Sequence, residues 1–225
     1  MTTRRRGLHG AMVDDLGRRI VHGELAAGSA LPLDALGTEY EVSRTVVRET
    51  MRVLEAKGLV TARQNVGTRV QDASAWQGLD VDVIRWRLRG PGGDDARREL
   101  LELRSAVEPV VAGLAAQRAS DAALQALTST AVRLEDALAA GDVDAFVAAD
   151  VEFHAALFAA AGNSMLDDLA SLVAEALGDR RTAAQAQGIS PAAIAAHRRL
   201  ADAVAAGDQV AATTAMSDIL SSQDD

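Results

Sequence analysis

Apolar residues recur at intervals of three and four along most of this 225-residue chain, the spacing that places them on one face of a helix. A first helix is predicted by the stripe Leu8, Met12, Leu16 and Ile20. Residues 33–41 predict a short second helix, and a third is predicted within residues 42–59 by Val46, Val47, Thr50, Val53 and Leu54. Residues 59–63 and 68–71 flank a turn sequence, Gln64-Asn65-Val66-Gly67, and indicate a two-stranded hairpin. Three helices followed by a hairpin predict a winged helix.

The third predicted helix carries both of its boundary signals and a basic open face. Ser43 is an N-cap residue, whose hydroxyl accepts a bond from an otherwise unpaired backbone N–H, and Gly58 stands where the helix is expected to end. The open face carries Arg44, Thr45, Arg48 and Arg52. An arginine fork can bond guanine O6 and N7 or a phosphate, so this face is a candidate DNA-reading surface. The alternative, from this helix alone, is a surface helix with solvated arginines.

Residues 23–70 resemble the DNA-binding domain of the GntR family of bacterial transcriptional regulators over its full length. The resemblance is carried by VSRTVVRE at residues 42–49 and LEAKGLV at residues 54–60. It implies that the third helix enters the major groove and the wing tip reaches the minor groove, which assigns DNA contacts to Arg44, Thr45, Arg48 and Gly67. Many members carry another DNA-contacting arginine after a Pro-Ser-Glu run. This chain has Pro32-Leu33-Asp34-Ala35 there and is shorter, so that contact is not carried over.

From residue 94 onward the pattern is helical throughout and predicts an antiparallel helical bundle. Glycines separate most of its segments, and Ser190-Pro191 is a favourable helix start. The six predicted segments are 94–118, 120–140, 142–161, 164–186, 190–206 and 208–222. Abundant alanine and leucine with few aromatic residues also favour helices. We therefore expect a mainly α protein, with a winged helix-turn-helix domain in residues 1–72 and a helical bundle in residues 94–225.

Residues 73–93 connect the two predicted domains. This segment is too apolar for a loose tether, because it contains Trp76, Leu79, Val83, Ile84, Trp86 and Leu88. We expect it to pack onto a domain, from where it can transmit motion, before Gly90-Pro91-Gly92-Gly93 interrupts the chain. The run SAWQGLDVDVIRWRL, residues 74–88, resembles the corresponding stretch in GntR-family regulators of sugar-acid catabolism.

Charge divides the chain along the same boundary. Residues 1–72 carry 11 Lys and Arg against 9 Asp and Glu, whereas the other residues carry 12 against 23. The basic end is the one with the winged-helix pattern, and its Arg4-Arg5-Arg6 run is either a phosphate-binding arm or a solvated tail. The chain has no cysteine, which excludes disulfides and thiolate chemistry. No apolar run approaches the roughly 18 residues of a membrane span, and the N-terminus has no apolar signal core, so we expect a cytoplasmic protein.

Three polar residues occupy apolar stripes that should face the bundle interior. Asp150 and His154 are four residues apart on a stripe with two phenylalanines, and His197 lies on the apolar stripe of a later helix. Burial of such groups is costly unless they are paired. One aspartate and two histidines suit a divalent metal such as Zn or Ni, with open positions for water or ligand. The alternative is an Asp150–His154 hydrogen bond and an independent core histidine.

Residues 102–116, 150–163 and 196–208 resemble the ligand-sensing FCD domain of the FadR subfamily of GntR regulators. This resemblance implies a metal site, but the family has a fourth ligand, a histidine on the last helix, where this chain has Ile219. The remaining ligands are Asp150, His154 and His197. With three ligands, three alternatives stay open. The site has a weaker affinity for metal, or the metal has more open coordination positions and accepts a bidentate effector, or the pocket works without metal.

Two arginines are candidate effector ligands. Arg104 lies beside an apolar stripe just before Pro109, which removes one helical hydrogen bond and can bend the helix around a cavity. By resemblance Arg104 binds the carboxylate of an effector, and the alternative is a surface ion pair with Glu108. Arg180 continues the stripe of a later helix and is a second candidate for the same role.

These features predict a ligand-responsive transcriptional regulator of a catabolic operon, with repression favoured. A small carboxylate such as a sugar acid would change the spacing of two DNA-binding domains in a homodimer that reads a palindromic operator. Two other classes stay open: a metal-dependent helical-bundle hydrolase with an accessory DNA-binding domain, and a structural DNA-binding protein. The hydrolase lacks a convincing general base or nucleophile motif. The structural protein does not explain polar residues directed into a bundle.

Overall fold

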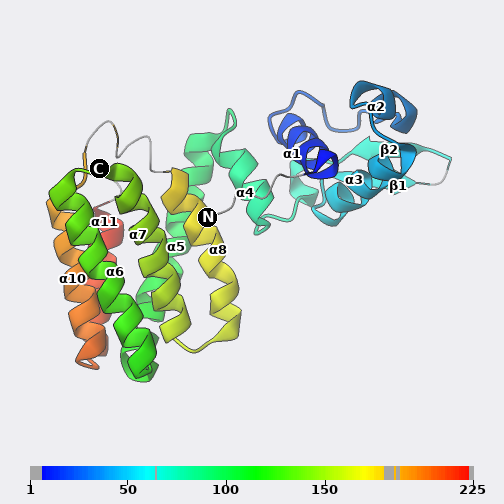
Figure 1. The fold of residues 1–225 in the computed structure, drawn as a ribbon. Coiled ribbons are helices and arrows are strands. Elements are labelled where there is room, and N and C mark those ends of the chain that lie inside the picture. Colours follow the sequence, from blue (N-terminus) through cyan, green and yellow to red (C-terminus); the bar gives the residue numbers. More distant parts are fainter. Residues whose placement is uncertain (1–6, 64, 180–184, 186–187, 223–225) are drawn as a thin grey trace. The chain divides into compact units, whose positions relative to one another are not determined.

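The chain forms two compact units, residues 1–96 and 97–225, in a computed structural model that describes residues 7–63, 65–179, 185 and 188–222 (Figure 1). The first unit combines helices with a two-stranded sheet, and the described elements of the second are all helical. No helix among the described residues is long and apolar enough to span a membrane. The prediction of a mainly α protein is confirmed.

The first unit is built on helices α1 (Leu8–Val21), α2 (Leu33–Glu39) and α3 (Arg44–Ala56), followed by strands β1 (Val60–Arg63) and β2 (Gly67–Val70). Helix α3 packs on both α1 and α2. Apolar side chains with little or no exposed surface fill the space between them: Met12, Leu16, Ile20, Val47, Met51, Leu54 and Leu59. The predicted winged helix is confirmed.

Helix α3 has the boundaries that its sequence predicts. It begins after Ser43, whose hydroxyl oxygen accepts a backbone N–H of the first turn at 3.4 Å. At the other end the chain reverses at Gly58, which has φ +75°, and the N–H of Leu59 donates to the carbonyl oxygen of Leu54 at 2.9 Å. A Cβ on Gly58 would lie 2.1 Å from the carbonyl oxygen of Ala75. Both the backbone conformation and the space therefore require glycine.

Replacing Gly58 with alanine should lower the free energy of unfolding of the first unit by about 2 kcal/mol or more, because the left-handed conformation costs an L residue about 1–2 kcal/mol and the clash adds to it. Both tryptophans lie in this unit, so tryptophan fluorescence during urea unfolding reports on it alone. Gly78→Ala is the matched control, since nothing lies within 4 Å of the added Cβ. Equal losses in the two variants would contradict the requirement for glycine at residue 58.

The wing is an antiparallel hairpin whose last pair before the turn is Arg63 with Gly67. Gly67 has φ +84° and is exposed. The loop before α2 joins the hairpin, because Ala30 forms a bridge with Arg69 of β2. The wing is thereby attached to the helices through backbone hydrogen bonds as well as through its buried valines.

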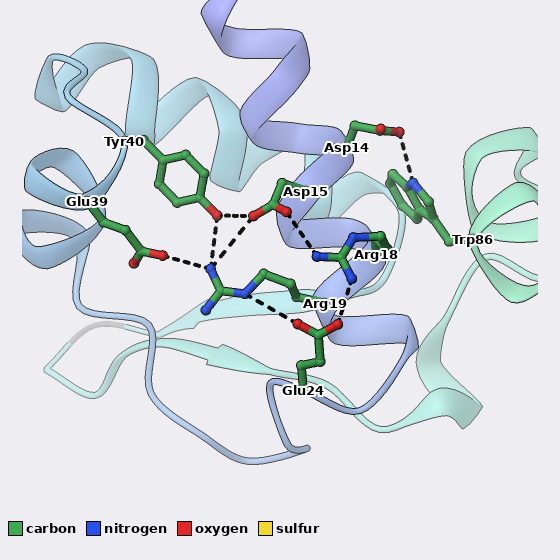
Figure 2. A network of polar contacts seen from close by, with 8 residues as sticks. All are labelled: Asp14, Asp15, Arg18, Arg19, Glu24, Glu39, Tyr40 and Trp86. Carbon is green, nitrogen blue, oxygen red and sulfur yellow. Dashed lines mark hydrogen bonds and ion pairs between the residues drawn. The ribbon is translucent and has the colours of Figure 1, made fainter. Parts of the chain in front are cut away.

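A network of charged side chains fastens α2 to α1 (Figure 2). Asp15 accepts a hydrogen bond from the hydroxyl of Tyr40 and pairs with Arg18 at 3.1 Å. Arg19 donates to Glu39 at 2.9 Å and to the Tyr40 hydroxyl oxygen at 3.0 Å. Burial, together with the bond to Asp15, raises the pKa of Tyr40 to about 12. The two arginines of α1 are therefore engaged by acidic and phenolic neighbours within the unit.

The predicted connector folds into a short 3-10 helix (Ala73–Ala75) and helix α4 (Val81–Leu88), and α4 packs against α1. The ring of Trp86 lies against Gly17, where an added Cβ would come within 2.2 Å of the indole. Its Nε1 donates to Asp14 Oδ1 at 3.0 Å (Figure 2). The expected packing of the connector onto a domain is thus observed for Trp86.

Lys57 ties the end of α3 to the start of α4. Its Nζ lies 2.8 Å from a carboxylate oxygen of Asp80 and 2.8 Å from one of Asp82. Burial lowers the pKa of Lys57, but its hydrogen bonds to the two carboxylates outweigh this and raise it. Asp80 also caps α4 by accepting its first backbone N–H groups. Because α4 packs on α1 and is paired with Lys57 at the end of α3, it is part of the first unit.

The second unit is a bundle of α-helices. Its described helices are α5 (Gly93–Arg118, which begins just before the unit), α6 (Asp121–Ala140), α7 (Val143–Ala160), α8 (Ser164–Asp179), α10 (Pro191–Ala205) and α11 (Gln209–Ser221). Short connections make neighbours antiparallel, and α6 packs on both α7 and α10, α7 on α8, and α10 on α11 (Figure 1). The predicted helical bundle is confirmed.

Four helices of the bundle begin directly after the first residue of a predicted segment. Each cap side chain accepts a backbone N–H three residues later, at Ser120, Asp142, Ser190 and Asp208. The predicted end of the fourth segment, residue 186, lies outside the described residues. The centre of the bundle contains large, fully buried side chains from several helices: Leu134, Phe153, Leu157, Phe158, Leu200 and Met216.

Candidate functional site

The predicted DNA-reading residues of α3 lie on its exposed face. Arg44, Thr45 and Arg48 occupy the first turns of the helix and are exposed. The Nε of Arg44 lies 3.0 Å from Asp34 Oδ1 at the start of α2, and both side chains are largely exposed. A helix N-terminus with two exposed guanidinium groups can bind phosphate oxygens and base edges.

The wing carries two exposed arginines that were not among the predicted DNA contacts. Arg63 and Arg69 line a hollow of about 480 Å³ that also includes Gly67, the predicted wing-tip residue. Arg69 donates to the carbonyl oxygen of Gly28 at 2.7 Å. In the sequence, the two arginines could have been found as DNA contacts only from their positions within the two predicted strands of the hairpin. The wing therefore adds positive charge beside its glycine.

Inside the second unit, α7 and α10 bring Asp150, His154 and His197 together. All three side chains are at most 2% exposed. The Nε2 of His197 lies 3.0 Å from Asp150 Oδ1, and the Nε2 of His154 lies 3.5 Å from the same oxygen. One ligand atom from each residue lies within 4.8 Å of the other two. His197 is therefore not an independent core histidine.

The other ring nitrogen of each histidine faces an oxygen outside this trio. The Nδ1 of His197 lies 2.7 Å from the carbonyl oxygen of Ala193, and the Nδ1 of His154 lies 2.8 Å from Glu108 Oε2 on α5. Such partners orient an imidazole so that its other nitrogen can bind a metal. Neither nitrogen of His154 completes a hydrogen bond of good geometry with any described residue. A buried imidazole without such bonds fits a metal ligand, and the Asp-His-His donor set suits Zn or Ni.

Glu108 links this trio to Arg104, one turn earlier on the same helix. The Nε of Arg104 lies 2.5 Å from Glu108 Oε1, with the two side chains 2% and 0% exposed. The ion pair considered as the alternative for Arg104 therefore exists, but it is buried and not on the surface. The sequence assigned Glu108 no role in the site. Only its four-residue spacing from Arg104 indicated that the two side chains could form a pair.

The buried groups form a chain of opposite charges. Burial lowers the pKa of His154, but the charges and contacts of Glu108 and Asp150 outweigh this and raise it to about 9. Burial raises the pKa of Glu108, but His154 and Arg104 lower it more. For Asp150, burial raises the pKa, but the close contacts and the charges of both histidines outweigh this and hold the pKa well below its usual value. Mutual pairing thus keeps these groups charged inside an apolar bundle.

A small pocket of about 10 Å³ adjoins Arg104 and Glu108. That is about the space for one water molecule. Its remaining lining is entirely apolar and comes from α5, α7 and α8: Leu100, Leu103, Val107, Phe158, Leu169, Leu172 and Val173. A ligand larger than water must therefore widen this region to reach Arg104.

Arg180, the second candidate effector ligand, lies outside the described residues. Ile219 is 1% exposed and belongs to the core of the bundle on α11. Its hydrocarbon side chain has no atom that can bind a metal. Of the four positions that the resemblance assigns to a metal, three therefore carry a side chain that could bind one: Asp150, His154 and His197.

The two units match known protein families. Residues 9–70 match the family described as bacterial regulatory proteins, gntR family, and residues 99–222 match the FCD domain. The chain is 32% identical over 208 residues to the galactonate operon transcriptional repressor of Escherichia coli K12, covering 91% of this chain and 90% of that protein. It is 30% identical over 213 residues to the regulator LutR of Bacillus subtilis 168, covering 88% and 90% of the two chains.

A solved structure of a Streptococcus agalactiae GntR protein aligns with a TM-score of 0.53 at 27% sequence identity, over 96% of this chain and 98% of that one. The family and its named relatives are transcriptional regulators, which removes the hydrolase alternative. The chain therefore belongs to the GntR family of bacterial transcriptional regulators and carries an FCD domain in its helical unit.

Proposed function

We propose that this protein is a cytoplasmic repressor of a sugar-acid catabolic operon that releases its operator when a small carboxylate binds inside the helical bundle. Residues 1–72 would form the DNA-binding domain, residues 73–93 the connector, and residues 94–225 the effector-binding and dimerisation domain. The name of the Escherichia coli relative, a galactonate operon repressor, supports a sugar acid as effector.

The observation that carries the proposal is the buried set of polar groups in a bundle that has no structural need for them. Arg104, Glu108, Asp150, His154 and His197 are all at most 2% exposed. Burial of so many ionisable groups is costly, and replacing such groups with apolar residues is often neutral or stabilising. Their retention is explained by a ligand that uses them.

The residues that would hold a divalent metal are Asp150, His154 and His197. A bound Zn or Ni would supply a positive, Lewis-acidic centre with open coordination positions for an effector carboxylate. Arg104 can bind a second oxygen of the same ligand, because a guanidinium bonds carboxylates through two N–H groups. Ala193 and Glu108 orient the two imidazoles from outside the trio.

On the DNA side, Arg44, Thr45 and Arg48 would read the major groove, and Gly67 at the wing would approach the minor groove. A homodimer presents two such helices related by two-fold symmetry, so its operator is palindromic with half-sites about one or more helical turns apart. The exposed positions of these residues on α3 and at the wing support the assignment. The effector acts because it binds one arrangement of the dimer better than the other.

Replacing Arg104 with alanine should weaken the response to effector while leaving DNA binding intact. The assay is release of the zinc-loaded protein from its operator by galactonate, after the operator has been identified by selection from random duplexes. Loss of a buried guanidinium removes the carboxylate ligand and should raise the galactonate concentration needed for release by about tenfold or more, since charge-assisted bonds contribute roughly 1.5–3 kcal/mol.

The matched control is Arg133→Ala, because Arg133 pairs with Glu152 through an exposed ion pair in the same unit. This variant should respond like the parent protein. A full response of Arg104→Ala, or no release of the parent protein by galactonate and other sugar acids, would contradict the proposed function.

A further inference from the structure

One side of the wing gathers polar and basic residues. Residues directly opposite each other in an antiparallel pair share a face of the sheet, and so does every second residue of a strand. In this hairpin Thr61 pairs with Arg69 and Arg63 pairs with Gly67, so these four residues lie on one side. The other side carries the buried valines of both strands and belongs to the core of the first unit. The side with the two arginines is therefore the outer face of the wing.

The two arginines of this outer face differ in what holds them. Arg69 donates to the carbonyl oxygen of Gly28 at 2.7 Å, so its guanidinium is tied to the loop before α2. The side chain of Arg63 is exposed and forms no hydrogen bond or ion pair with any residue that the structure describes. The guanidinium of Arg63 is therefore available to a partner outside the chain.

Two acidic side chains lie near the outer face, and both are bonded to backbone groups. Glu55 of α3 accepts the backbone N–H of Ala62 at 2.8 Å. Asp72 lines the same hollow as the two arginines and accepts the backbone N–H of Ser74 at 3.2 Å. Neither carboxylate pairs with Arg63. The outer face thus keeps a positive charge close to the turn of the hairpin, where it attracts an anion.

The hairpin presents little bulk beside Arg63. Gly67, directly opposite, has no side chain, and a Cβ added to it would meet nothing within 4 Å. The minor groove of B-DNA is only about 6 Å wide. Runs of A·T pairs narrow this groove further and strengthen its negative potential, which attracts an inserted arginine. One unpaired guanidinium beside a bare glycine backbone matches such a narrow, negative groove.

We propose that Arg63 enters the minor groove beside each half-site and reads its width, so that the operator carries A·T pairs there. This inference rests on the proposed function, because it places α3 in the major groove and Gly67 at the adjacent minor groove. Arg63 is a specificity-determining residue that acts through the shape and potential of the DNA. Arg48 would then select the half-site, and Arg63 would select the base pairs that flank it.

The test compares duplexes that differ only in the base pairs flanking each half-site. The operator is first selected from random duplexes with the parent protein, and its flanks are then made A·T, G·C or inosine·C. Inosine lacks the N2 amino group that guanine places in the minor groove, and it keeps the major-groove acceptors of guanine. In fluorescence anisotropy, the parent protein should bind the A·T and inosine·C duplexes about tenfold more tightly than the G·C duplex, an effect typical of one changed base pair.

The variant that tests the residue is Arg63→Ala. Its preference among the three flanks should disappear, while its selected half-site stays that of the parent protein. Arg89→Ala is the matched control, because Arg89 is another exposed arginine of the first unit and lies at the end of α4, outside the hairpin. This variant removes the same charge and should keep the preference of the parent protein.

Two results with the parent protein alone overturn the inference, and neither depends on the folding of a variant. One is equal binding of the three duplexes. The other is a preference for A·T flanks that inosine·C does not restore, because a major-groove contact then explains it. An unchanged preference in Arg63→Ala also overturns the inference, and so does an equal loss of affinity for all three duplexes, as expected of a phosphate contact.

The selection step separates the inference from the proposed function. If the parent protein selects no operator from the random duplexes, the proposed function fails, and the role of Arg63 fails with it. If an operator is selected but its flanks have no effect that depends on Arg63, the proposed function stands and only the role of Arg63 is rejected.

Discussion

Replacing Arg48 with alanine is expected to abolish specific operator binding and to leave effector-induced stabilisation of the bundle unchanged. Arg48 is exposed on the face of α3 that is turned away from the core, where its guanidinium can bond guanine bidentately. Each good bidentate contact contributes about 1–3 kcal/mol of discrimination, and the proposed two-fold symmetric dimer would lose it twice. The expected loss in specific binding is therefore about 2–6 kcal/mol.

The measurement is a fluorescence-anisotropy titration with operator and with scrambled duplex at several salt concentrations. A base contact lowers the ratio between the two affinities, whereas a phosphate contact lowers both and reduces the salt dependence. Arg199→Ala is the control, because Arg199 is an exposed arginine of the bundle that pairs with Asp218. If Arg48→Ala retains operator selectivity, the assignment of the recognition face is wrong.

Replacing Asp150 with asparagine is expected to remove all stabilisation by zinc or nickel. Asp150 Oδ1 lies 3.0 Å and 3.5 Å from the Nε2 atoms of His197 and His154, so its loss breaks the trio at its centre. At a free metal concentration about 100-fold above Kd, the parent protein should gain about 2.7 kcal/mol of stability, while the variant gains none. Differential scanning calorimetry with metal and with chelator measures both.

Asp168→Asn provides the control for this substitution, since Asp168 is exposed on α8 and belongs to no buried cluster. It should show the full gain of the parent protein. A parent protein that gains no stability from zinc or nickel, and loses none with chelator, would exclude the metal site. Equal gains in the parent and in Asp150→Asn would place the metal elsewhere.

The wing and the recognition helix were predictable because their determinants are local. Ser43 and Gly58 mark the ends of α3 through bonds to backbone groups within a few residues, and those bonds do not depend on distant parts of the chain. Four bundle helices begin where their segments were predicted to begin for the same reason, because a cap side chain at each start accepts a backbone N–H three residues later. Periodicity, in turn, predicts which face is buried, although not which element covers it.

The candidate site was predictable only in part. The four-residue spacing of Asp150 and His154 places them on one helix face, and this needed no tertiary information. Their contact with His197 joins residues 47 positions apart, so it depends on how α7 and α10 pack. From the sequence, Arg104 was either an effector ligand or a member of a surface ion pair with Glu108. The structure shows that the pair with Glu108 exists and is buried.

By itself, the sequence determined the type of the elements in the winged helix and the bundle, the boundaries of α3, and the acid and imidazole groups on interior faces, because caps, turns and periodicity act over a few residues. Only the tertiary structure decided that Trp86 packs on Gly17, and that Glu108 joins Arg104 to His154. These contacts depend on the packing of side chains from separate helices, and burial then determines which charges must be paired inside the bundle.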